Sequence, residues 1–204
     1  MSRIDRPEGC GKGQDGTTLV ELMVTIAMAT VIGGAAVVAL ANVLGFSRTV
    51  ASRASAEQQA QLGVNQIQSQ VRSGNVLSQP EATAEGWSVL VYTQANREQK
   101  CVQWQLVNAT GELRTRSWSP GWDADGRLDP GEVTDWHTVA TDIVNAQTGQ
   151  APFTVPADAP YGARLLDVVL VVQAGGGERQ VLSMAATGRN TDYGYDQTIC
   201  GDQP

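Results

Sequence analysis

The chain has 204 residues and a mass of 21.6 kDa, enough for one ordinary domain and an appendage. Its 14 Lys and Arg against 21 Asp and Glu give a net charge of −7, which disfavours general binding to nucleic-acid phosphates. With one histidine, His137, and three cysteines, Cys10, Cys101 and Cys200, the chain lacks the ligands for a usual Cys/His zinc site.

The segment from Met1 to Gly16 is polar and glycine-rich. Three basic and three acidic side chains give it no net charge, so a signal for membrane orientation from basic residues is weak. An ordinary secretory signal has a basic start, a short apolar stretch and a cleavage site after that stretch. Here the polar segment comes first and the apolar stretch follows, which indicates a different kind of signal.

An apolar run without a charged side chain extends from Leu22 to Phe46. As a helix rising about 1.5 Å per residue it reaches roughly 37 Å, longer than the roughly 30 Å hydrocarbon core of a bilayer. The alternative is a buried core helix, but Thr25, Thr30 and Asn42 are too few for the usual polar stripe. We therefore predict a membrane-spanning helix, with Gly33 and Gly34 weakening it locally.

One acidic residue, Glu21, stands at the start of this run, where an unpaired carboxylate is costly. The stretch GTTLVELM, from Gly16 to Met23, resembles the class III signal of type IV prepilins and type II secretion pseudopilins. The resemblance implies cleavage after Gly16 by a prepilin peptidase, N-methylation of Thr17, and a docking role for Glu21 as the fifth mature residue. The family usually has phenylalanine where this chain has Thr17.

Cleavage after Gly16 would create an amine on Thr17, four residues before Glu21 on one helix. At that spacing the amine and the carboxylate can neutralise each other, or each can pair with a neighbouring subunit. In a filament core of low dielectric, such pairing would offset the burial of both charges and set the register of assembly. The alternative is a carboxylate that lies at the lipid headgroups.

The helical period continues beyond Phe46 with a more polar composition. Four apolar residues recur at steps of 4, 3 and 4 and so share one helix face: Ala60, Val64, Ile67 and Val71. We predict one helix from about Thr18 to Arg72, ended near Ser73 and Gly74, that is membrane-embedded first and packed on a domain second. The alternative, a heptad coiled coil, lacks the usual charged flanking positions.

Short runs of β-like sequence follow, separated by turn residues. They span Trp87 to Gln94, Cys101 to Asn108, Glu112 to Ser119, Trp136 to Val144, Leu165 to Ala174 and Arg179 to Thr187. An antiparallel sheet is expected, with the glycines at 175–177 joining the last two strands as a hairpin. The apolar run LLDVVLVV predicts a central strand covered on both faces, one of which could receive the helix stripe.

The predicted fold class is α+β: a long N-terminal helix on a β-rich domain, the lollipop of type IV pilins. Its four parts are a leader at residues 1–16, a transmembrane or filament-core helix at 17–46, an amphipathic continuation at 47–74, and an extracytoplasmic β-domain at 75–204. Residues 136–190 also resemble, more loosely, minor pilins of the PilW kind and J-type pseudopilins.

Two cysteines would remain after removal of the leader, which contains Cys10. We predict a disulfide between Cys101 and Cys200, because the domain would face an oxidising exterior. The bond would close a loop of about 100 residues and contribute up to roughly 4–5 kcal/mol on the chain-entropy estimate. The alternative is two free thiols.

An acidic stretch from Gly121 to Glu132 resembles an EF-hand calcium loop around Gly126. The candidate Ca²⁺ ligands are the side chains of Asp123, Asp125, Asp129 and Glu132 and the backbone carbonyl of Arg127. Position 1 is glycine where EF-hands have aspartate, so the expected affinity is in the roughly 0.1–1 mM range of extracellular modules. The alternative is a solvated turn built from Asp-Gly and Pro-Gly.

Two tryptophans, Trp118 and Trp122, flank a turn beside this loop and are candidates for an exposed patch that binds a sugar or a protein. The alternative is that they fill the sheet core. His137 is predicted to lie in a strand, and no serine or cysteine motif accompanies it. A nucleophilic triad therefore has little support, and we expect no enzymatic activity.

The expected function is that of a structural, minor pilin-like subunit of a type IV pilus. Its expected partners are the prepilin peptidase, other pilin subunits, the assembly platform and the membrane. The expected location is a single pass through the inner membrane and then an extracytoplasmic filament on a bacterial surface. The alternatives are a pseudopilin of a type II secretion system and a membrane-tethered module that binds calcium or carbohydrate without polymerising.

Overall fold

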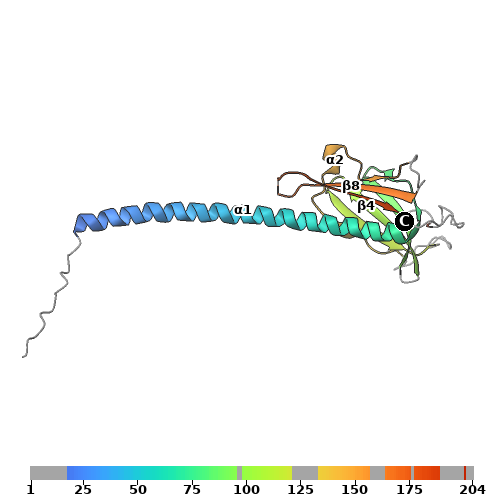
Figure 1. Cartoon of the computed structure of the whole chain (residues 1–204), viewed down its shortest axis with the longest axis horizontal. Helices are drawn as coiled ribbons and strands as arrows, with labels where there is room; N and C mark the ends of the chain where they lie inside the picture. The colour runs from blue at the N-terminus through green and yellow to red at the C-terminus, as the bar shows by residue number, and fades with distance from the viewer. Residues whose placement is uncertain are drawn as a thin grey trace, which may run out of the picture. The chain divides into compact units, whose positions relative to one another are not determined.

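The computed structural model describes residues 18–95, 98–120, 133–156, 164–175, 177–188 and 200. The chain divides into two compact units, Met1–Ser47 and Arg48–Pro204. Helix α1, Leu19–Ser73, contributes to both units and appears as one continuous ribbon (Figure 1). The prediction of a single helix from about Thr18 to Arg72 is therefore confirmed to within one residue at each end.

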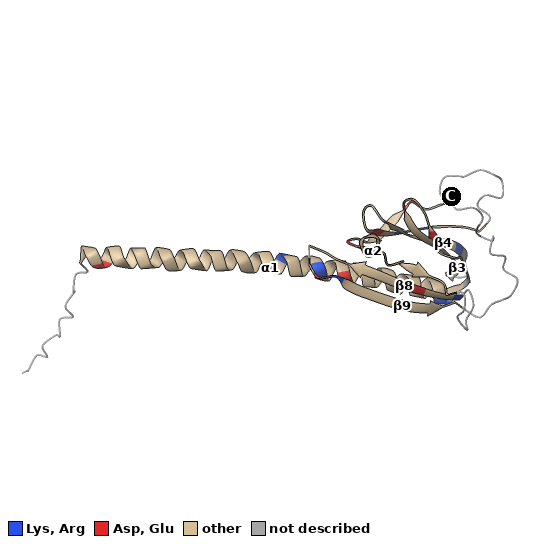
Figure 2. Ribbon diagram, turned by 90° about the horizontal axis from the view of Figure 1, so that it is seen from above, with Lys and Arg blue, Asp and Glu red and all other residues tan. Residues whose placement is uncertain are grey.

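The first unit contains the apolar part of α1. All side chains of the helix up to Ser47 are exposed, and the ribbon carries almost no charge along this stretch (Figure 2). The hydroxyls of Thr25 and Thr30 donate hydrogen bonds to the carbonyls of Leu22 and Ala27, both at 2.8 Å. Because those polar groups are satisfied within the helix, they do not oppose an apolar surrounding. By length and composition this stretch can cross a membrane.

The second unit joins the rest of α1 to strands and one short helix. Within the described residues the further elements are β1 (Gly74–Leu77), β2 (Glu81–Ala82), β3 (Gly86–Ala95), β4 (Glu98–Val107), β5 (Glu112–Trp118), β6 (His137–Ala140), α2 (Asn145–Thr148), β7 (Phe153–Thr154), β8 (Leu165–Val172) and β9 (Gln180–Thr187). All six predicted strands are present. The four elements that the sequence did not reveal, β1, β2, β7 and α2, have four residues or fewer.

The strands form two antiparallel sheets where we predicted one. The larger has the order β1-β3-β4-β5-β6 with β2 also paired to β3, and the smaller has the order β7-β8-β9. In the larger sheet, β3 and β4 pair without interruption over ten residues each. In the smaller, β8 and β9 pair over eight, which confirms the predicted hairpin.

The second part of α1 packs into the core of this unit along one stripe. The buried residues of the stripe are Ala56, Ala60, Gly63, Val64, Ile67 and Val71, which include all four predicted positions. All of them except Gly63 belong to the same apolar cluster as Val89 and Trp104 of the larger sheet and Leu166 and Val168 of the smaller.

Small residues in the stripe allow the helix to approach the sheet closely. A Cβ atom at Gly63 would lie 2.9 Å from Leu113 Cδ2 and 3.3 Å from Val139 Cγ1, nearer than van der Waals contact permits. The Trp104 indole Nε1–H, on the sheet, donates a hydrogen bond of 2.7 Å to Gln70 Oε1 on the helix. Helix and sheet are thus joined by packing and by a polar contact.

Strand β8 is central in its sheet, but it is not covered on both faces as predicted. Leu166, Val168 and Leu170 are fully buried, whereas the intervening Leu165, Asp167 and Val169 are only partly buried. One face of the strand therefore lies in the core along its length, whereas the other face is only partly covered until Val171, which is 5 % exposed.

A buried asparagine supplies hydrogen bonds to β8 beyond the point where its pairing with β7 stops. Asn145, at the start of α2, is 1 % exposed. Its Nδ2 donates to the carbonyls of Val169 at 2.7 Å and Gln150 at 3.0 Å, and its Oδ1 accepts from the Val171 N–H at 2.8 Å. One side chain thus replaces part of a neighbouring strand, which explains why a polar residue is buried here.

Candidate functional site

The start of α1 is capped by a threonine three residues before the acid. The Glu21 backbone N–H donates a hydrogen bond of 3.3 Å to Thr18 Oγ1, and the Leu22 N–H donates one of 3.1 Å to the Thr18 carbonyl. Thr18 is therefore the N-cap, and Glu21 is the third helical residue in a T-x-x-E pattern typical of a capping box. Sequence reasoning missed this signal, although the four letters Thr18 to Glu21 contain it.

Glu21 lies in the first turn of α1, and Arg72 lies in the last. Each charge has the sign that favours its end of the helix dipole. The Glu21 carboxylate thus stabilises the helix start besides any contact with another chain. The residues predicted to flank the cleaved bond, Gly16 and Thr17, lie outside the described residues, so cleavage, N-methylation and docking stay predictions.

None of the residues that the structure describes covers the apolar stretch beside Glu21. Its large side chains are exposed by between 47 % (Val24) and 73 % (Leu19), among them Ile32 at 70 % and Phe46 at 72 %. Soluble monomers rarely expose contiguous apolar surface of this extent, because removing it from water is strongly favourable. The stretch is therefore compatible with a single-pass membrane anchor.

Cys101 and Cys200 form a disulfide that ties the C-terminal end of the chain to β4. The S–S length is 2.01 Å and the Cα–Cα distance is 5.7 Å, within the usual geometry. Both cysteines are at most 2 % exposed and pack with Leu90, Tyr92 and Trp118 in a second apolar cluster.

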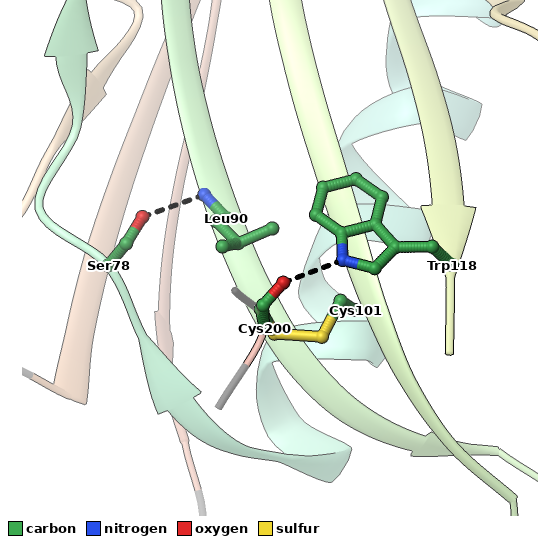
Figure 3. The surroundings of a disulfide bond; sticks show 5 residues. All are labelled: Ser78, Leu90, Cys101, Trp118 and Cys200. Atoms are coloured by element: carbon green, nitrogen blue, oxygen red, sulfur yellow. Dashed lines mark hydrogen bonds between the residues drawn. A yellow bond between two sulfur atoms is a disulfide. The ribbon is translucent and has the colours of Figure 1, made fainter. Parts of the chain in front are cut away.

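A hydrogen bond reinforces the disulfide from the neighbouring strand. The Trp118 indole Nε1–H donates to the Cys200 carbonyl at 2.9 Å, and Figure 3 shows the indole nitrogen pointing at that oxygen. On the other side of β3, the Leu90 N–H donates to Ser78 Oγ at 2.9 Å (Figure 3). Two residues of the disulfide cluster, Trp118 and Leu90, are therefore fixed by hydrogen bonds as well as by packing.

Of the two alternatives for Trp118, the structure confirms burial in the sheet and contradicts an exposed patch. The side chain is 2 % exposed, because residue 118 shares a face of the sheet with Cys101, its partner in the β4–β5 pairing. Trp122 lies outside the described residues. His137 begins strand β6 and is exposed, in agreement with a strand histidine.

The candidate calcium ligands lie outside the described residues, so this prediction stays open. They are Asp123, Asp125, Arg127, Asp129 and Glu132. Elsewhere, in the ranges that the structure describes, no three His, Cys, Asp or Glu side chains come together as a metal site. Comparison of the chain with protein-family models, curated proteins and solved structures yields no match.

Proposed function

We propose that this chain is a prepilin-like structural subunit of a filament of the type IV pilus class, with a type IV pilin-like fold. The observation that carries the proposal is the uncovered apolar part of α1 with the single acid Glu21 in its first turn. A membrane accounts for the apolar surface, and a lateral neighbour accounts for an acid at its boundary.

In this proposal a prepilin peptidase cuts between Gly16 and Thr17, and Thr17 is N-methylated. The chain is then held by a single pass in the inner membrane of a bacterium. On assembly the apolar stretch moves from lipid into a core of like helices, while the second unit faces outward. Both surroundings are apolar, so the transfer leaves the buried area of the stretch almost unchanged.

The proposed role of Glu21 is to meet the Thr17 amine of a subunit that is already docked. The pair would neutralise two charges that are costly in a low-dielectric core, so a subunit without the carboxylate would leave the amine unpaired. The T-x-x-E cap gives Glu21 a second role within its own helix. The experiment must therefore separate docking from capping.

The separating variants are Glu21→Gln, Glu21→Ala and Thr18→Ala, expressed in cells that assemble the filament. Glutamine keeps the third position of a capping box but removes the charge, and Thr18→Ala removes the cap but keeps the charge. We expect both Glu21 variants to lose assembly, measured in the fraction sheared from cells, and Thr18→Ala to keep it. Assembly by Glu21→Gln at the wild-type level would refute the docking role, and a wild-type chain that never polymerises would refute the proposal.

A further inference from the structure

Two arginines on α1 follow closely after its apolar stretch. Over residues 22–56 the only charged side chains are those of Arg48 and Arg53. Neither forms an ion pair within the part of the chain that the structure describes, although Glu57 lies four residues beyond Arg53. The end of the apolar stretch therefore carries positive charge without an acidic partner, in a chain whose net charge is −7.

The positions of these arginines along the helix match the headgroup layer of a bilayer. At about 1.5 Å per residue, Arg48 lies about 3 Å and Arg53 about 10 Å beyond Phe46, where the apolar run ends. The headgroup layer adds about 5–8 Å on each side of the hydrocarbon core. Side chains on a helix lean toward its N-terminus, so both long side chains reach back toward this layer.

The β8–β9 hairpin supports the guanidinium group of Arg53. A Cβ atom at Gly177 would overlap the Nη2, Nε and Cζ atoms of Arg53, so the guanidinium lies directly over this glycine. Beside it, a Cβ atom at Gly175 would lie 3.2 Å from Ser52 Oγ. Because the guanidinium rests on the hairpin, it is already ordered, and less conformational entropy is lost when it binds an anion.

The two arginines differ in how they can meet an anion. In the described part of the chain only Nε of Arg53 is enclosed without a partner, so its two Nη groups, which carry most of the donors, supply the contact. Arg48 is exposed. Five residues separate the two, which at about 100° per residue places their side chains about 140° apart around the helix. They therefore contact two separate headgroups.

We propose that Arg48 and Arg53 each bind the phosphate of an anionic phospholipid, in the leaflet at which the apolar stretch ends. A guanidinium presents paired N–H donors that match two phosphate oxygens, and it is more weakly hydrated than an ammonium group. A lipid with net negative charge is preferred to a zwitterionic one, because the choline cation of the latter repels the arginines. The inference rests on the membrane anchor of the proposed function, but not on cleavage or assembly.

The test is the lipid preference of the full chain in phosphatidylcholine vesicles. Electron paramagnetic resonance compares the association of spin-labelled phosphatidylglycerol with that of spin-labelled phosphatidylcholine. We expect phosphatidylglycerol to associate about two- to fivefold more strongly at low salt, and the preference to disappear at about 0.5 M salt. Equal association of both lipids at low salt would overturn this proposal alone, whereas a chain that does not enter the vesicles would refute the membrane anchor.

Inorganic phosphate distinguishes a lipid site from a site for any phosphate. Sodium phosphate at about 10 mM, with the ionic strength held constant by sodium chloride, should leave the preference unchanged, because the lipid is far more concentrated around the helix. Loss of the preference in phosphate would show a site for a soluble anion and would overturn the assignment to a headgroup.

Variants locate the two contacts. Arg48→Gln and Arg53→Gln should each lower the preference, and the double variant should abolish it, because separate sites act independently. The control is Arg72→Gln, which removes the same charge from the last turn of the same helix, about 29 Å beyond Arg53, and should have no effect. An unaffected double variant, or an equal effect of Arg72→Gln, would contradict the assignment. Arg48→Gln, at an exposed site, keeps the test decisive if Arg53→Gln disturbs the hairpin.

Discussion

The two parts of helix α1 differ in what covers them. Up to Ser47 the side chains are exposed all round, whereas beyond it a stripe from Ala56 to Val71 is buried against the protein's own sheets. One continuous helix therefore has two parts with different surroundings. The second part packs against sheets of the same chain, whereas the first part packs against none of the residues that the structure describes. Under the proposed function, lipid and then neighbouring subunits surround the first part.

The comparison predicts that the same change, isoleucine to aspartate, affects a different property in each part of the helix. Ile67→Asp places a charge at a site that is 0 % exposed, and we expect a loss of about 3–5 kcal/mol in the free energy of unfolding of the second unit. Ile32→Asp, at a site 70 % exposed, should leave that unit folded and weaken membrane insertion by about 3 kcal/mol. Denaturant unfolding in detergent measures the first effect and carbonate extraction of membranes the second. Equal effects of both variants on unfolding would show that the two parts do not differ as described.

Loss of the disulfide should have the second largest effect on the free energy of unfolding of the second unit. The cysteines are 99 positions apart, so the double change Cys101→Ser with Cys200→Ser should lower the free energy of unfolding by about 2–5 kcal/mol. The matched control is Cys10→Ser, which lies in the proposed leader and should have no effect on the processed chain. Unfolding that is insensitive to reduction of the wild-type protein would contradict this expectation.

A smaller effect is expected at the hydrogen bond beside the disulfide. Trp118→Phe keeps a ring in the cluster but removes the indole N–H from the Cys200 carbonyl, which should lower stability by about 1–3 kcal/mol. Val181→Ala on strand β9, 62 % exposed, should change it by less than about 0.5 kcal/mol. Thermal unfolding followed by near-ultraviolet circular dichroism distinguishes the two, and equal melting temperatures would remove this bond from the account.

The smallest effect is expected at the uncovered end of the helix. Thr18→Ala removes the acceptor of the Glu21 N–H and should destabilise the first turn by about 1 kcal/mol, whereas Thr18→Ser should keep it. Amide hydrogen exchange of residues 19–22 in detergent measures the opening of that turn. Faster exchange in the serine variant than in the alanine variant would contradict the capping role.

The sequence carried most of the fold because the periodic signals were long. The helix stripe of Ala60, Val64, Ile67 and Val71 and strands β3, β4, β5, β6, β8 and β9 were predicted from the sequence pattern, and the structure contains them, although β6 is only the four residues His137–Ala140. Strands β2 and β7, of two residues each, have no period to detect and exist because a longer strand offers them hydrogen bonds.

Other features depended on tertiary contacts that spacing cannot express. The sequence left both a surface and a core position open for Trp118, and its burial follows from pairing with Cys101 on β4 and from contact with Cys200. The division into two sheets and the bridging role of Asn145 arise in the same way. The Thr18 cap is different, since its four-residue pattern was readable and was overlooked.

The most direct test of the proposed function is the intact mass and N-terminal sequence of the protein extracted from native membranes. The account predicts a chain that begins at Thr17, lacks residues 1–16, contains the Cys101–Cys200 bond, and carries one added methyl group on the new amine. A chain that begins at Met1 in its mature, membrane-embedded form would contradict it, because Glu21 would then have no Thr17 amine to meet.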